Sequence, residues 1–229
     1  MKQNLLQELL AGQQSKQAMA IATNLATNEQ LLFDLNADDA PLWMLTLARE
    51  AARADKSKVV QSPDGTDWFL NIHNTPLRLM IIGAVHIAQP LSHMALQTGY
   101  DVTVIDPREA FASKARFPNV TLKTQWPDEA LNALNLDART AVVALTHDPK
   151  LDDPALEMAL TSSCFYIGAL GSKKTQTARH ERLSSAGFDE TTRRRIHGPV
   201  GLNIGAKSPA EIAISIMAEI TQTLRQVNS

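Results

Sequence analysis

Residues 77–108, LRLMIIGAVHIAQPLSHMALQTGYDVTVIDPR, carry the pattern that decides the fold of this chain. An apolar run from Leu77 to Ile82 stops at Gly83, and a helical pattern follows from about residue 86. A second apolar run, residues 101–105, ends at Asp106. The stretch therefore predicts a strand–helix–strand unit with a glycine at its first turn and a carboxylate at the tip of its second strand.

The spacing of this glycine and this carboxylate is typical of a nucleotide site. Asp106 follows Gly83 by 23 positions, near the roughly 20 residues at which an acid meets a ribose hydroxyl. Gly83 and Ala88 match the fingerprint G-x-G-x-x-G/A, while Val85 replaces the glycine that lets the backbone approach a pyrophosphate. Because the loop still offers N–H groups and a helix N-terminus, it predicts a phosphate-bearing ligand. The alternative is a Rossmann-like scaffold without a ligand.

The composition narrows the classes of function. The chain has 229 residues, 44% of them hydrophobic, and a net charge of −2, which favours a globular protein and argues against a nucleic-acid partner. No run approaches the ~18 apolar residues of a membrane span, and the first 17 residues contain no apolar signal region, so a cytoplasmic protein is expected. The lone cysteine, Cys164, is predicted to be a buried thiol. The basic run 193–195 is interpreted as solvated surface.

Two segments of the chain differ in pattern. Residues 1–76 predict a small α+β domain, with helices at 4–10 and 41–54 and strands at 19–25, 31–35, 59–61 and 68–72. Residues 77–229 predict strands at 78–82, 101–105, 120–123, 140–145 and 164–167, and helices at 86–98, 109–115, 127–134, 152–160, 172–186 and 208–226. Several of these later strands are apolar without alternation, so both faces of their sheet should be covered. The second segment therefore predicts a doubly wound, parallel α/β domain.

The last helix has the clearest start signal in the sequence. Ser208, Pro209 and Glu211 occupy the N-cap, N1 and N3 positions of a capping box. Residues 212–220, IAISIMAEI, are apolar on nearly every side, which predicts that this helix is buried.

Ligands of open parallel sheets bind outside the carboxyl ends of the strands, so the residues that follow the strands form the candidate site. His86 could bond a phosphate or a pterin, or remain a capping or exposed histidine. Arg108 could counter a phosphate or pair with Asp106. Thr146-His147-Asp148 could orient a ligand, accept a proton or contact a metal, although local turn chemistry also explains Asp148.

The turn after the fifth predicted strand also suits an anion, because a glycine turn, a hydroxyl at an N-cap and two lysines, Lys173 and Lys174, occur together, although a plain cap with solvated lysines is the alternative. The glycine-spaced loop 198–205 could wrap the same crevice or form a tight corner. No catalytic or metal-binding residue is assigned. The predicted cofactor-binding residues are Gly83, Val85, His86, Ala88, Asp106, Arg108, Thr146, His147, Asp148, Gly168, Gly171, Ser172 and Lys173.

Several segments together resemble the C-terminal domain of the XdhC/CoxI family, which comprises maturation factors for xanthine-dehydrogenase-type and CO-dehydrogenase-type molybdenum enzymes. The sequence departs from the family at Val85 and Asn203, where glycine and aspartate are usual, and it lacks the family's N-terminal Gly-Ser-Ser-Pro-Arg and Gly-Gly-Cys-Val-Glu stretches. The matching segments are GAVHIA (83–88), GYDVTVIDPR (99–108), RFP (116–118), ALTHDPKLDDPAL (144–156), YIGALGSKKT (166–175) and the stretch 195–220.

This resemblance implies a cofactor-handling chaperone more than an enzyme. It implies binding of molybdenum cofactor (molybdopterin) or a nucleotide, help with its sulfuration, and transfer to the large subunit of a molybdenum hydroxylase. A cysteine desulfurase as a second partner and a homodimer are also implied. Two alternatives stay open: a small NAD-dependent oxidoreductase, and a degenerate paralogue that serves as a dimeric interaction module.

Overall fold

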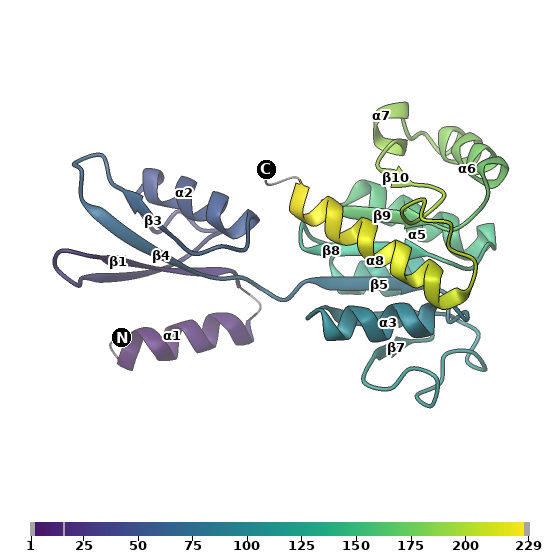
Figure 1. The fold of residues 1–229 in the computed structure, drawn as a ribbon, viewed down its shortest axis with the longest axis horizontal. Helices are drawn as coiled ribbons and strands as arrows, with labels where there is room; N and C mark the ends of the chain where they lie inside the picture. Colours follow the sequence, from purple (N-terminus) through teal and green to yellow (C-terminus); the bar gives the residue numbers. More distant parts are fainter. Residues whose placement is uncertain (1–2, 16, 227–229) are drawn as a thin grey trace. The chain divides into compact units, whose positions relative to one another are not determined.

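The computed structural model describes residues 3–15 and 17–226 (Figure 1). The chain forms two compact units, and the boundary between them lies between Thr75 and Pro76. Each unit has its own sheet and its own hydrophobic core. None of the helices in the described residues is both long enough and apolar enough to cross a membrane.

The N-terminal unit is a four-stranded antiparallel sheet with strand order β2-β1-β4-β3 and a helix on each face, which confirms the small α+β domain. Side chains alternate along the first strand, so both faces of the sheet are covered. Ala20 and Ala22 pack against the helix 42–53, whereas Met19 and Ile21 pack against the helix 3–14. Its elements are α1 (Gln3–Gln14), β1 (Met19–Asn24), β2 (Gln30–Asp34), α2 (Leu42–Arg53), β3 (Lys58–Gln61) and β4 (Asp67–His73).

The C-terminal unit is a six-stranded parallel sheet, which confirms the predicted doubly wound α/β class. Its strands, in the spatial order β10-β9-β8-β5-β6-β7, are β5 (Arg78–Ile82), β6 (Asp101–Ile105), β7 (Thr121–Lys123), β8 (Thr140–Ala144), β9 (Tyr166–Ala169) and β10 (Ile196–His197). Its helices are α3 (Ala88–Gln97), α4 (Pro127–Leu134), α5 (Pro149–Thr161), α6 (Lys173–Ser185), α7 (Glu190–Arg193) and α8 (Pro209–Gln226).

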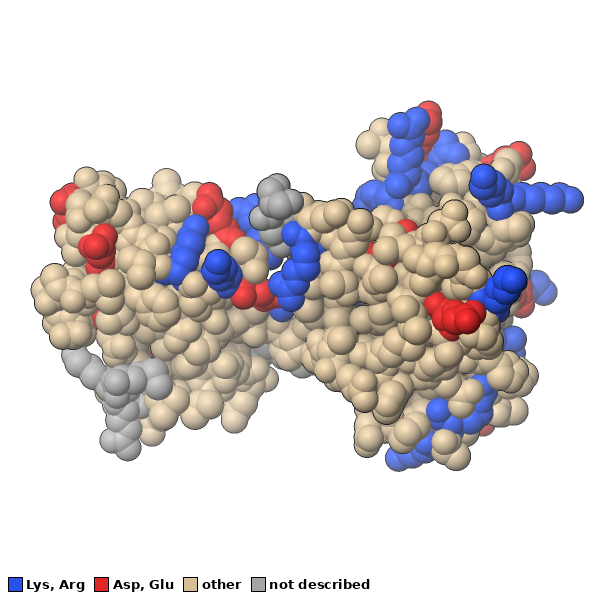
Figure 2. Space-filling view, in the orientation of Figure 1, with Lys and Arg blue, Asp and Glu red and all other residues tan. Residues whose placement is uncertain are grey.

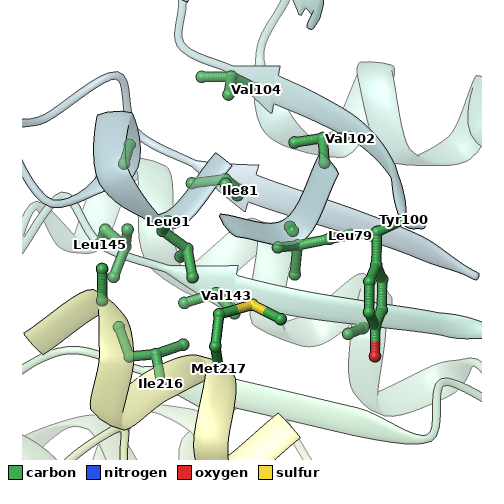
Figure 3. Packing of buried hydrophobic residues seen from close by; sticks show 14 of the residues in the cluster. Leu79, Ile81, Leu91, Tyr100, Val102, Val104, Val143, Leu145, Ile216 and Met217 are labelled. Carbon is green, nitrogen blue, oxygen red and sulfur yellow. The ribbon is translucent and has the colours of Figure 1, made fainter. Parts of the chain in front are cut away.

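Helices cover both faces of this sheet, as the unbroken apolar strands require. On one face α3 and α8 pack Leu91 and Ile216 against Ile81 and Val143 (Figure 3). On the other face α4, α5 and α6 pack against the alternate residues of the same strands. Each fully buried Leu or Ile contributes about 1.5–3 kcal/mol relative to an exposed one, so this double cover is the main source of the unit's stability.

The strand order reverses between β5 and β8. From β5 the chain runs outward through β6 to β7, and it then returns to place β8 on the other side of β5. The loops after β5 and β8 therefore leave the sheet in opposite directions, which is the arrangement that opens a ligand crevice in folds of this kind.

Two local predictions were wrong. Residues 109–115 form turns and no helix, because the chain there must bring Phe117, only 1% exposed, into the core against α3. The basic run 193–195 is not simply solvated: the Arg195 guanidinium donates to the carbonyls of Leu160, Ser162 and Cys164 at 2.7, 3.0 and 3.0 Å. Arg195 therefore closes the carboxyl end of α5 and belongs to the structural framework.

The start of α8 follows the predicted capping box. The Glu211 side chain accepts from the N–H of Ser208 at 2.8 Å, and the Ser208 hydroxyl accepts from the N–H of Glu211 at 3.3 Å. The prediction that this helix is buried holds for one side only. Ile216 and Ile220 are fully buried, whereas Ile214 is 50% exposed, so α8 also presents an apolar outer face.

Candidate functional site

The turn after β5 is built around a glycine that no other residue can replace without strain. Gly83 has φ +104°, and a Cβ at this position would lie 2.6 Å from Cγ2 of Thr146, in the loop after β8. The protein's own threonine thus occupies the space beside the turn. The predicted helix start at residue 86 shifts to Ala88, so His86 lies in the turn and is exposed.

Asp106 bonds two groups of the protein itself, the Ala84 N–H and the Arg108 side chain. The residue is fully buried, and its Oδ2 accepts from the N–H of Ala84 at 2.8 Å. Arg108 reaches both carboxylate oxygens, with Nε and Nη2 each at 2.8 Å. Burial alone raises the pKa of Asp106, but the hydrogen bonds from Arg108 and Ala84 outweigh it, so the pKa lies below its ordinary value. The role of Asp106 as a ribose ligand stays a prediction, and the geometry adds a structural role.

Val85 and Ala88 pack into the hydrophobic core beneath α3. Val85 is partly buried and packs against the hydrophobic cluster beneath α3 and α8, and Ala88 is fully buried at the first position of α3. The valine that departs from the glycine fingerprint therefore contributes to packing. Whether either residue contacts a ligand stays a prediction.

The loop after β8 brings the predicted histidine and aspartate to the surface. His147 is exposed and has φ +62°, an uncommon conformation for a residue with a side chain. Asp148 caps α5 by accepting from the N–H of Lys150 at 3.0 Å. The Asp106 carboxylate raises the pKa of Arg108, and the charge of Asp148 adds to this rise. Arg108 and the β8 loop therefore interact electrostatically across the β5 turn.

A buried polar network underlies these loops. Asp152 accepts from the Thr146 hydroxyl at 2.7 Å, and its other oxygen lies 3.5 Å from Nη2 of Arg179. Arg179, only 2% exposed, donates to Gln176 at 2.6 Å and to the Leu170 carbonyl at 3.0 Å. The network ties the turns after β8 and β9 to α5 and α6. Burial raises the pKa of Asp152 and lowers that of Arg179, despite their mutual attraction.

No group of three or more His, Cys, Asp or Glu side chains in the described part of the chain is placed to hold a metal ion. The metal contact considered for His147 and Asp148 therefore lacks a set of protein ligands there. Cys164 is 5% exposed and burial raises its pKa, which confirms the packed thiol.

The turn after β9 joins two of the predicted features. Ser172 is the N-cap of α6, and its Oγ accepts from the N–H of Thr175 at 3.2 Å. Gly171 has φ +145°, and a Cβ there would lie 2.9 Å from Thr175. Gly168 is buried, with Cγ2 of Val200 and the Tyr166 hydroxyl against it. Lys173 is exposed at the first position of the helix.

A cavity of about 420 Å³ lies beside this turn. Its walls are Leu170 and Lys173 at the start of α6, the loop 199–206, and Ile212 and Ser215 on α8. Among these lining residues, Lys173 is the charged one. The N–H groups of Asn203, Gly205 and Ala206 find no acceptor among the described residues, so they remain available to a ligand. Lys173 is thus a predicted site residue that the structure places at a cavity.

Two glycines of the loop 198–205, Gly198 and Gly201, allow close packing. A Cβ at Gly198 would lie 2.3 Å from Cδ of Gln176, and a Cβ at Gly201 would lie 2.3 Å from Oγ of Ser215. Gly201, with φ +91°, donates its N–H to Glu219 at 2.8 Å. The loop is therefore a tight corner pressed between α6 and α8, and it also forms a wall of the cavity.

Sequence reasoning missed the group that anchors this loop. Glu219 on α8 accepts from the Tyr166 hydroxyl at 2.5 Å, and His197 lies 3.4 Å from its other oxygen. The Tyr166 and His197 rings stack at 4.7 Å between centroids. Burial alone raises the pKa of Glu219, but its hydrogen bonds outweigh this effect and lower the pKa. The one sequence signal was a carboxylate in the middle of an otherwise apolar helix.

Known proteins resemble this chain over most of its C-terminal unit. A sequence profile described as the XdhC Rossmann domain matches residues 79–220. A protein of Bacillus subtilis (strain 168), named as a probable xanthine dehydrogenase subunit, is 34% identical over 163 residues, which are 71% of this chain and 47% of that protein. The "Molybdenum cofactor insertion chaperone PaoD" of Escherichia coli (strain K12) is 33% identical over 159 residues, 68% of this chain and 44% of that protein.

A crystal structure of a protein described as a xanthine dehydrogenase, from Bacillus halodurans, aligns with 97% of this chain and 80% of its own, with a TM-score of 0.60 and 23% identity. At that identity the likeness shows the fold alone. The chain spans less than half the length of the two curated relatives. On the profile match and the two sequence relatives, the chain belongs to the XdhC Rossmann domain family.

Proposed function

We propose that this chain is an accessory protein that binds molybdenum cofactor, or a nucleotide form of it, for a xanthine-dehydrogenase-type molybdenum hydroxylase. It would assist sulfuration of the cofactor or its insertion into the large subunit. The observation that carries the proposal is the 33% identity to a protein named a molybdenum cofactor insertion chaperone, over 68% of this chain. The family profile covers residues 79–220, which lie in the unit that contains the parallel sheet.

The cavity beside α6 supports cofactor binding at this edge. A phosphate-bearing pterin needs a cation, hydrogen-bond donors and apolar surface, and the walls supply Lys173, free backbone N–H groups and Leu170 with Ile212. No acidic side chain is among the lining residues to repel the phosphate. The volume of about 420 Å³ lies within the roughly 300–1,000 Å³ usual for small-molecule sites.

We assign distinct tasks to the residues around the edge. Lys173 and the turn Gly168–Ser172 would hold the phosphate, while the β5 turn with Gly83, Val85, His86 and Ala88 would offer a second anion contact. Arg108, Thr146, His147 and Asp148 would line the pterin side, and Asp106 would meet a ribose if the ligand is a nucleotide. When bound, the cofactor supplies the molybdenum chemistry of the client enzyme; this chain binds and orients it.

The partners follow from the same proposal. Sulfur for the cofactor would come from another protein, such as a cysteine desulfurase, because Cys164 is 5% exposed and its raised pKa suppresses the thiolate. The receiving partner would be the large chain of the hydroxylase. A cytoplasmic location and a homodimeric state are also part of the proposal.

The test compares two adjacent lysines. Lys173 lines the cavity and Lys174 does not, so Lys173→Ala and Lys174→Ala remove the same charge from neighbouring positions. Protein purified anaerobically from cells that make the cofactor is assayed for bound pterin by mass spectrometry. We expect Lys173→Ala to lower the pterin content about tenfold, as the loss of one charge-assisted contact implies, and Lys174→Ala to leave it unchanged. Absence of pterin from the wild-type protein would refute the function, and equal content in both variants would refute the site.

The competing hypothesis is a small NAD-dependent oxidoreductase, which rests on the β5 turn and Asp106. The geometry supports it less, because the carboxylate already bonds Ala84 and both guanidinium nitrogens of Arg108 that face it. Titration with NADH, followed by its fluorescence, separates the two hypotheses: saturable binding near 1:1 would favour the oxidoreductase.

A further inference from the structure

The outer surface of α3 and α8 carries a groove that the proposed cofactor site does not use. It has a volume of about 610 Å³ and is lined by Met94, Gln97 and Thr98 at the end of α3 and by Ile214, Met217 and Gln222 with their neighbours on α8. Ile214 is 50% exposed there, beside the apolar side chains of Met94 and Met217. All lining residues belong to the C-terminal unit.

This surface is free of charge over a long stretch of both helices. Residues 84–100 include no Asp, Glu, Lys or Arg, and residues 212–224 include only Glu219. Glu219 points inward, because its carboxylate bonds Tyr166 and Gly201 and its side chain is 14% exposed. Figure 2 shows the face over the middle of α8 without charged side chains, while Lys, Arg, Asp and Glu lie around it.

We propose that this surface, the α3–α8 face, is the interface between two copies of the chain related by a two-fold axis; the inference extends the proposed homodimer by assigning its contact surface. A two-fold interface brings a patch against itself, so any charge near the axis would meet its own like charge. The α3–α8 face avoids this conflict by carrying none. Its polar groups, among them Gln97, Thr98 and Gln222, each hold both a donor and an acceptor, so each can pair with its own copy.

The composition and extent of the face suit a lasting contact. Methionine is enriched and charged residues are depleted at the centres of protein interfaces, and Met94 and Met217 line this groove. The 18-residue helix α8 is about 27 Å long, the 10-residue helix α3 is about 15 Å long, and each is about 10 Å wide, so the face measures on the order of 400 Å² before side-chain relief. That is roughly half of the ~800 Å² per partner in a standard interface. A client protein that docked through charge would need charged residues here.

The test measures the mass of the full chain in solution. Sedimentation equilibrium at about 10–100 µM should give twice the 25.0 kDa of one chain. Ile214→Glu places like charges on both sides of the interface and should weaken the dimer at least about a hundredfold, which leaves monomer over this range. The matched control is Ile204→Glu, because Ile204 is 56% exposed in the same unit but lies in the glycine loop, and this variant should stay dimeric.

Folding and association are separated by a second variant. Thr221→Arg changes an exposed helix position of the same groove without touching the core, and it should also dissociate the dimer while circular dichroism shows an unchanged melting temperature. A monomeric wild-type protein would overturn the proposal, as would dimers that persist in both Ile214→Glu and Thr221→Arg. The outcome is independent of cofactor binding, because the lysine variants above leave this face intact.

Discussion

Two glycine turns at the same edge of the parallel sheet differ in how much open space lies beside them. At the β5 turn the protein fills the site with its own groups: the Asp106 carboxylate takes the Ala84 N–H, and the Thr146 methyl lies against Gly83. At the β9 turn the loop 198–205 packs tightly on α6 and α8, yet a cavity of about 420 Å³ remains between them. The β5 turn has the stronger sequence signature of a nucleotide site, yet the protein's own side chains fill more of the space beside it.

A glycine and a carboxylate at this spacing predict that the two residues lie close together, but they do not predict what the carboxylate binds. Their spacing predicts that the acid lies near the first turn, and the bond from Ala84 to Asp106 at 2.8 Å confirms this proximity. The spacing does not determine whether the acid serves a ligand or the turn itself. Whether the acid serves a ligand or the turn depends on a third group. Here that group is Arg108, two residues after Asp106, whose guanidinium neutralises the carboxylate.

The largest effect is expected where the β9-side loop is tightest. Gly201→Ala would place a Cβ 2.3 Å from Oγ of Ser215 and 3.1 Å from the backbone N of Ile216, at φ +91°. Overpacking and the unfavourable φ together should lower the free energy of unfolding by about 3 kcal/mol, measured by urea denaturation. The control is Gly205→Ala, with φ +76° and no atom within 4 Å of its Cβ, which should cost only about 1 kcal/mol. Equal costs at the two positions would show that the loop is not held as tightly as described.

A smaller effect is expected at the β5 turn. Asp106→Asn keeps the shape of the side chain but removes the charge that faces Arg108, and one amide N–H₂ must then face a donor. We expect a loss of about 2 kcal/mol in the free energy of unfolding at pH 7, since the buried N–H of Ala84 or the Arg108 guanidinium loses its acceptor. Asp101→Asn, at the exposed start of the same strand, should change stability by less than about 0.5 kcal/mol. If Asp106→Asn left the free energy of unfolding unchanged, the structural role of Asp106 would be contradicted and a role in ligand binding would be favoured.

Much of the fold could be predicted from local sequence patterns. Strands β5, β6 and β8 are apolar runs that end at a glycine, an aspartate and a threonine, so the parallel sheet and its carboxyl edge were both predictable. The two-residue strand β10 was not, because a pair such as Ile196 and His197 has no periodicity. Residues 109–115 look helical locally, but the need to bury Phe117 prevails there.

The candidate site was predictable only in part, because its supporting groups come from far apart in the chain. Glu219 meets Tyr166 across 53 positions, and Arg179 meets Asp152 across 27. Arg179 lies in a helix whose residues are nearly all polar, so nothing in the sequence distinguishes this buried arginine from an exposed one. Such contacts follow from strand order and helix placement, which local patterns do not specify.

The smallest effect is the pH dependence of the Asp106 contribution, and it distinguishes a structural carboxylate from one that awaits a ligand. The pKa of Asp106 is lowered in the folded state, so its stabilisation is complete above the unfolded value of 3.8 and is lost as the pH falls through the folded pKa. The stability difference between wild type and Asp106→Asn should therefore be constant from pH 7 to about 5 and shrink below about 4. Urea denaturation of both proteins at pH 7, 5, 3.5 and 2.5 measures it, at roughly 1.4 kcal/mol per unit of pKa shift. A difference that does not change with pH would mean that the charge of Asp106 contributes nothing to the β5 turn, and the contrast between the two turns would then rest on Thr146 alone.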